Sequence, residues 1–149
     1  MPRRTKSAEL IEFEIRFYEK LVTAYPDFVD ALVPLGHAYT RLGHYDKGLQ
    51  IDQRLTQLRE SDSVIWYNLA CSYSLLKRLE ESATSPRRSI ELGYRDFQHL
   101  QNDPDLLNLR RSPQYQELLS SFVSLAAMKH QRTPSTDDPA ASDSSPLNL

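Results

Sequence analysis

The feature of this sequence that most constrains its fold is an internal repeat with a period of 34 positions. When the 149-residue chain is shifted along itself by that distance, apolar, small and aromatic residues fall on residues of the same kind. The aligned pairs are Leu32–Trp66, Leu35–Leu69, Gly36–Ala70, Tyr39–Tyr73 and Leu42–Leu76. A period of about 20 to 50 residues is typical of proteins built by stacking one small structural unit.

The hydrophobic pattern predicts that this unit is helical. Apolar residues recur at steps of three and four, the period of an α-helix, and the chain holds only 4 glycines. We predict an all-α fold with helices over 8–25, 29–42, 45–59 and 64–77, a fifth ending at 92, short ones near 97–101 and 106–109, and a last one over 113–130.

Two helices in each repeat of this period resemble the tetratricopeptide repeat (TPR) family. In the first helix of that repeat, a bulky residue is followed by leucine, a small residue and tyrosine. The matching residues here are Leu32, Leu35, Gly36 and Tyr39, and again Trp66, Leu69, Ala70 and Tyr73. A half repeat precedes them, with Pro26 in the position of the family's terminal proline. The resemblance implies an α-α superhelical solenoid of about two and a half repeats.

The resemblance also implies a domain organisation. The segment GYRDFQHLQNDPDLLNLRRSPQYQELL is similar to the closing segment of some bacterial TPR arrays, so we expect 94–130 to form C-terminal capping helices after repeats over 8–93. We expect a flexible N-terminus over 1–7. The tail over 131–149 is rich in Thr, Ser, Asp and Pro, and its few apolar residues predict disorder.

Three residues depart from the family's pattern. Pro86 lies inside the fifth helix, where a proline costs about 3 kcal/mol. We therefore predict that the helix is kinked or restarts at Ser85, with 80–84 as a looser turn. Pro34 predicts that the second helix starts late, near Asp30, or bends. Asp52 stands where the family prefers an aromatic residue.

Composition excludes several classes of partner. A formal net charge of −2 argues against nucleic acid, which is bound by cationic surfaces. No apolar stretch approaches the length of a membrane span, and the basic residues at the start are followed by glutamates, so we expect neither a membrane anchor nor a secretory signal. A single cysteine is typical of a reducing compartment, which predicts a cytoplasmic protein.

The lone cysteine, Cys71, raises the question of catalysis. His37 lies one repeat earlier, so the two side chains are expected on neighbouring helices, and a thiol-dependent enzyme is one hypothesis. We favour the alternative that Cys71 is a small residue on a packed or groove-facing helix. His99 and Asp103 share a face if their segment is helical, but no pattern of metal-ligand spacing is present, so we expect neither a metal nor a cofactor.

In the TPR family, the first helix of each repeat lines a concave groove. Transferred to this sequence, the resemblance predicts a groove lined by Val33, His37, Thr40, Arg41, Val64, Tyr67, Asn68, Cys71 and Ser74, preceded by Asp30. Asn68 matches an asparagine of chaperone-binding members. Val33 and His37 stand where those members hold the lysines of a carboxylate clamp, so capture of a chaperone C-terminus is not expected.

These observations predict a non-enzymatic protein–protein interaction module or scaffold. We expect it to bind a partner peptide or helix in the groove, anchored by Tyr67, Trp66 or the Asn68 amide. An alternative is a homo-oligomeric assembly or adaptor factor that pairs through its last helix. The thiol-dependent enzyme using Cys71 and His37 is the third hypothesis.

Overall fold

The computed structural model describes residues 5–131, apart from the side chains of residues 129 and 130, and this part of the chain is helical with no strand. The elements are α1 (Lys6–Ala24), α2 (Val29–Arg41), α3 (Tyr45–Leu58), α4 (Ser63–Leu75), α5 (Leu79–Glu91), α6 (Phe97–Asn102), the 3-10 helix η1 (Pro104–Leu106), α7 (Leu107–Arg110) and α8 (Pro113–His130). The predicted all-α class is confirmed.

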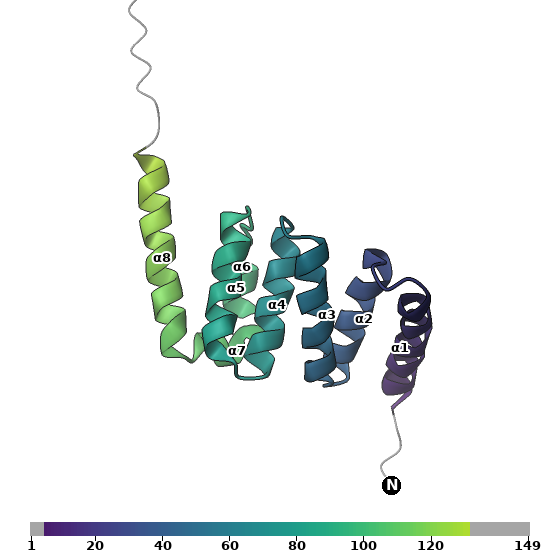
Figure 1. The fold of residues 1–149 in the computed structure, drawn as a ribbon. Coiled ribbons are helices and arrows are strands. Elements are labelled where there is room, and N and C mark those ends of the chain that lie inside the picture. Colours follow the sequence, from purple (N-terminus) through teal and green to yellow (C-terminus); the bar gives the residue numbers. More distant parts are fainter. Residues whose placement is uncertain (1–4, 132–149) are drawn as a thin grey trace, which may run out of the picture.

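The helices form a row in which each packs against the next from α1 to α5 (Figure 1). The short elements η1 and α7 then pack on α4, and α8 packs on α5 at the C-terminal end of the row. Each helix thus contacts its neighbours in the row rather than one central core. This arrangement is the predicted TPR-like α-α solenoid.

The starts of the helices repeat with the same period of 34 positions from α2 to α8. The first helices of successive units begin at Val29, Ser63 and Phe97, each 34 positions after the last. The second helices begin at Tyr45, Leu79 and Pro113, with the same spacing. The segment 94–130 therefore keeps the register of the repeats. It is called the capping segment below, and its helices the capping elements, after the role predicted for it. In place of one continuous first helix it has α6, η1 and α7.

Small residues allow close helix packing, as predicted. A Cβ atom added to Gly36 of α2 would lie 3.1 Å from the Cγ2 atom of Ile51 in α3, so the two helices approach closely there and a larger side chain would require Ile51 to shift. The tyrosines at equivalent positions of α2 and α4 each form a hydrogen bond with the second helix of the preceding unit. The Tyr39 hydroxyl donates to the Glu19 carboxylate of α1, and Gln53 of α3 donates to the Tyr73 hydroxyl at 3.2 Å.

The buried residues divide along the row. Ile15, Leu35, Ala38 and Tyr39 pack between α1 and α2, and Leu32, Leu55 and Ile65 pack among α2, α3 and α4. The largest cluster, called the C-terminal core below, joins α4 and α5 to the capping elements. It consists of Tyr67, Ala70, Cys71, Ile90, Leu100, Leu106, Leu109, Tyr115 and Leu118.

The predicted restart of the fifth helix at Ser85 and the looser turn over 80–84 are wrong. Helix α5 runs without interruption through Pro86, and 80–84 is helical rather than a looser turn. Ser85 is not a helix cap, because its hydroxyl donates 3.0 Å back to the carbonyl of Glu81. The Pro86 ring is less than 2% exposed, and burying it offsets part of the lost backbone hydrogen bond. Pro34 lies inside α2, which begins at Val29, one residue before the predicted start near Asp30.

The chain ends differ slightly from the predicted limits. Helix α1 begins at Lys6 with Thr5 as its N-cap, so the last two residues of the predicted flexible segment 1–7 are helical. Residues 1–4, and the predicted disordered tail from residue 132 onward, lie outside the described residues. Within 5–131, no helix combines the length and apolar character needed to cross a bilayer.

Candidate partner-binding groove

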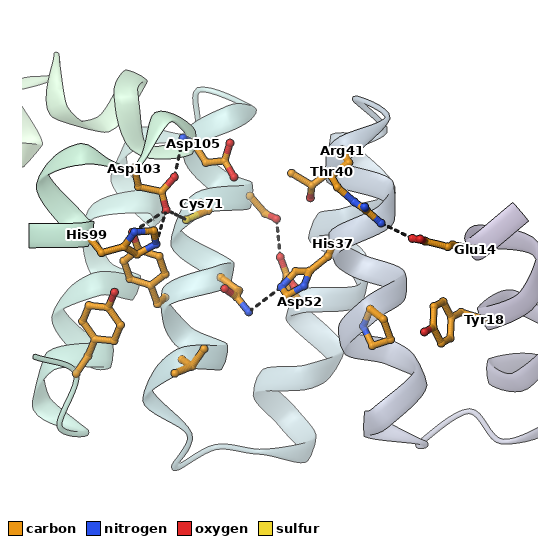
Figure 2. Close-up of a pocket in the computed structure, with 16 residues that line it drawn as sticks. Glu14, Tyr18, His37, Thr40, Arg41, Asp52, Cys71, His99, Asp103 and Asp105 are labelled. Atoms are coloured by element: carbon orange, nitrogen blue, oxygen red, sulfur yellow. Dashed lines mark hydrogen bonds and ion pairs between the residues drawn. The ribbon is translucent and has the colours of Figure 1, made fainter. Parts of the chain in front are cut away.

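An open groove of about 630 Å³ follows the face formed by α2, α4 and the capping elements, and it reaches α1 at one side (Figure 2). Its lining comes from separate segments of the chain because the first helices of successive units stand side by side. The lining residues are Glu14, Tyr18, Pro34, His37, Thr40, Arg41, Asp52, Val64, Tyr67, Asn68, Cys71, Ser72, Tyr94, His99, Asp103 and Asp105.

Seven of the nine residues predicted from the sequence border this groove, and two do not. Val33 packs instead against the buried cluster that contains Leu32 and Leu55. Ser74 is fully buried, and its hydroxyl accepts a 3.2 Å hydrogen bond from the backbone N–H of Leu109. The prediction that Ser74 lines the groove assumed that this face of α4 is exposed. It is wrong because α7 covers the face.

The sequence reasoning missed the wall that the capping segment supplies: Tyr94, His99, Asp103 and Asp105. A signal for Asp105 was present, because it lies 34 positions after Cys71, which lies 34 positions after His37. Extending the repeat by one further unit would have placed Asp105 on the groove. Asp52 and Ser72, which lie deeper between α3 and α4, carried no such signal.

In the middle of the groove, His37 of α2 faces Asn68 of α4. The His37 Nε2 atom lies 3.4 Å from the Asn68 amide nitrogen, so the two first helices are joined by a polar pair (Figure 2). Burial, and next the positive charge of Arg41, lower the pKa of His37, while Asp105 opposes them. The imidazole is therefore neutral at pH 7. Arg41 itself is paired with Glu14 across the α1 side of the groove.

At the capping end, Asp103 organises a hydrogen-bonded cluster. Its Oδ2 atom accepts from the Tyr67 hydroxyl at 2.7 Å and lies 3.3 Å from His99 Nε2, so the predicted shared face of His99 and Asp103 is observed. Its Oδ1 atom accepts from the backbone N–H of Asp105 at 2.9 Å. The described residues contain no cluster of three or more His, Cys, Asp or Glu side chains suited to a metal ion.

The environment of Cys71 is the reverse of that of a catalytic thiol. Its side chain is 8% exposed, and its sulfur lies 3.7 Å from Asp103 Oδ2, whereas His37 is engaged with Asn68. Burial, followed by the negative charges of Asp103 and Asp105, raises the pKa of the thiol well above its ordinary value. A reactive cysteine needs a lowered pKa, so the geometry does not support the pairing of Cys71 with His37.

Neither aromatic residue that was predicted as an anchor offers an accessible contact surface in the groove. Tyr67 is 3% exposed, and its ring stacks on Tyr94 with the centroids 4.7 Å apart. Trp66 does not line the groove, and its indole N–H donates to the carbonyl of Glu60 at 2.8 Å. Of the three predicted anchors, Asn68 remains accessible from the groove.

Comparison with known proteins agrees with this architecture. Residues 64–92, which comprise α4 and α5, match the tetratricopeptide repeat family. The fold and this match define an all-α helical repeat of the TPR kind, a type of module that serves protein–protein interaction and is typically non-enzymatic.

A relative extends the similarity beyond one repeat. The chain is 31% identical over 90 residues to a chloroplastic protein of Arabidopsis thaliana, and the alignment covers 58% of this chain. It covers 27% of the plant protein, so the chain spans about a quarter of that relative's length.

Proposed function

We propose that this protein is a non-enzymatic interaction module that binds an extended or helical segment of a partner protein in its groove. The observation that carries the proposal is the open groove of about 630 Å³ along the first helices of three successive units, which is lined by both polar and apolar surface. A groove of this shape suits a continuous segment better than a compact ligand, because its lining is spread along the row of helices.

The chemistry of the lining favours particular features in the partner segment. The neutral His37 ring and the Asn68 amide offer hydrogen bonds to a peptide backbone at the middle of the groove. Val64, which is 52% exposed, offers an apolar contact at its edge. Asp105 and Asp103 make the capping end acidic, which favours a lysine or arginine in the segment.

A selection from random peptides tests the proposal, because it requires no partner of defined sequence. Random peptides displayed on phage are selected on the wild-type chain, and their dissociation constants are measured by fluorescence anisotropy. We expect Asn68→Arg to weaken the selected peptides by about tenfold or more, because it fills the middle of the groove. Asp105→Asn should weaken peptides with a basic residue and reduce the salt dependence of binding.

The matched control is Gln50→Arg, which adds the same charge at an exposed position of α3 outside the groove. It should leave affinities within about twofold. Circular dichroism checks that each variant is folded. Failure to enrich any peptide, or equal binding to wild type and Asn68→Arg, would count against groove recognition.

Three finer inferences accompany the proposal. The segment 94–130 closes the array, as the similar segment does in bacterial arrays, which is supported by its packing on α4 and α5. The cytoplasmic location stays a prediction, and the relative is a chloroplastic protein. Pairing through the last helix is favoured by the exposure of Val123 (71%) and Met128 (68%) on α8.

A further inference from the structure

Helix α1 carries an apolar stripe on the side opposite to its packing with α2. Leu10, Phe13 and Phe17 are 60%, 59% and 51% exposed, and their spacing of three and four residues places them on one face. Isolated exposed apolar residues are ordinary on protein surfaces, whereas a contiguous set of large side chains marks a site of contact.

The residues at equivalent positions one repeat later show what this face of a second helix contacts. The residues 34 positions later are His44, Lys47 and Ile51, and all three contact α2, the first helix of their own unit. The His44 ring lies 6.2 Å from the Tyr39 ring, Lys47 Nζ lies 5.4 Å from the same ring, and Ile51 lies against Gly36.

The stripe is therefore the surface on which a preceding first helix would pack. Within residues 5–131 no helix precedes α1, which stands at one end of the row (Figure 1). The equivalent second helix α3 is preceded by a first helix, α2, and its residues at the positions of Leu10 and Phe13 are His44 and Lys47. In α1 they are large and apolar, as expected of a surface that is covered by association.

We propose that this stripe pairs with the same stripe of a second copy, as two antiparallel α1 helices related by a two-fold axis near Phe13. The charges beside the stripe favour this arrangement. Glu9 and Arg16 are exposed and seven residues apart, so they lie on the same side of the helix. An antiparallel copy places its Arg16 level with Leu10, about 1.5 Å along the axis from Glu9. Each Glu9 thus meets the Arg16 of the other copy.

The remaining charges along the helix limit the strength of the pair. Glu14, on the other side of the stripe, is neutralised by Arg41 of its own chain. Lys6 of one copy lies level with Lys20 of the other, and both are exposed side chains that turn toward solvent. Three half-exposed side chains per copy bury less area than a standard interface, so the dimer is weak, with a dissociation constant of about 10 to 100 μM.

Sedimentation velocity on the full chain from about 1 to about 300 μM tests the pairing. We expect a reversible, concentration-dependent dimer. Phe13→Glu places a charge at the two-fold axis and should raise the dissociation constant about 30-fold or more. Glu9→Arg and Arg16→Glu should each raise it about three- to tenfold, and the double reversal should restore it, because the opposite charges then meet again.

Leu107→Glu is the matched control, because it adds the same charge at an exposed apolar position of α7, outside both proposed pairing helices. It should leave the dissociation constant unchanged. A monomer throughout the range, a dimer that tolerates Phe13→Glu, or dissociation by Leu107→Glu would each overturn the proposal. A double reversal that fails to restore the dimer would overturn the antiparallel arrangement. Groove binding of peptides enters none of these measurements, so the two proposals stand or fall separately.

Discussion

Asp52 is an acidic side chain that lies buried inside the row of helices. It is 6% exposed between α3 and α4, where the Ser72 hydroxyl donates to it at 2.5 Å. Burial is the dominant cause that raises the pKa of Asp52 from 3.8 to about 6, and the hydrogen bond from Ser72 opposes it only in part. At neutral pH the chain holds a buried carboxylate that lacks an ion pair among the described residues.

The raised pKa makes a prediction about stability and pH. Below 3.8 Asp52 is protonated in both states. Between 3.8 and about 6 the folded state binds the proton more tightly, so the free energy of unfolding falls as the pH rises, and above about 6 the loss is complete. Asp52→Asn keeps an acceptor for Ser72 and removes the charge. We expect it to be neutral near pH 3.5 and stabilising by about 2 kcal/mol at pH 7.5.

Urea unfolding of wild type and variant at both pH values measures this difference, because the pH dependence of all other groups cancels. Glu60→Gln, at an exposed turn, is the matched control and should shift stability by about 0.5 kcal/mol or less at both. A variant less stable than wild type at pH 7.5 would show that the charged form of Asp52 is favoured by its surroundings.

At the scale of the element, three helices end in the same left-handed turn, and one of the three makes it without glycine. After α2 and α5, Gly43 and Gly93 adopt positive φ angles of 80° and 110°. After α4 the turn is made by Lys77, with φ 57°, and the same pair of backbone hydrogen bonds closes it. A side chain in this left-handed region costs about 1 kcal/mol relative to glycine.

We therefore expect Lys77→Gly to stabilise the protein by roughly 0.5 kcal/mol, after the entropy lost by glycine is subtracted. Gly43→Ala, at the equivalent position one repeat earlier, should destabilise by about 1 kcal/mol. A Cβ atom there has no neighbour within 4 Å, so backbone conformation alone causes the effect. Thermal unfolding followed by circular dichroism measures both changes, and destabilisation by Lys77→Gly would contradict the interpretation.

At the scale of the whole molecule, the C-terminal core joins the second repeat to the segment that follows it. Tyr67 and Ala70 of α4 pack there with Leu106, Leu109 and Leu118 from the capping segment. A solenoid in which units contact only their neighbours stays cooperative when such an interface is strong. We therefore expect the capping segment and the second repeat to unfold together.

Leu118→Ala tests this coupling, because Leu118 is 1% exposed on α8. The variant should lose about 2–4 kcal/mol. Its denaturation midpoint should shift equally by circular dichroism and by the fluorescence of Trp66, which lies on α4. Val123→Ala, at 71% exposure on the same helix, should change stability by about 0.5 kcal/mol or less. An unmoved Trp66 transition would mean that α8 unfolds independently.

Much of the architecture could be predicted from the pattern of residues along the sequence. The offset of 34 positions and the helical spacing predicted the solenoid, because the same packing pattern occurs in more than one repeat. The predicted helix boundaries lie within about two residues of those observed, except the start of the fifth helix. Gly36 was identified as a close-packing position, and His37, Thr40 and Asn68 were placed on the groove side of their helices.

Other features could not be predicted, because they depend on which helices pack against one another. Pro86 predicted a break in the fifth helix, but the helix continues through it and the proline ring is buried. Ser74 and Cys71 share a face with Asn68 in sequence, yet the capping segment buries both. By itself the sequence determined a TPR-like row of helices and which face of each first helix points to the groove. Only the tertiary structure decided which of those residues stay accessible, since burial depends on the packing of segments far apart in the chain.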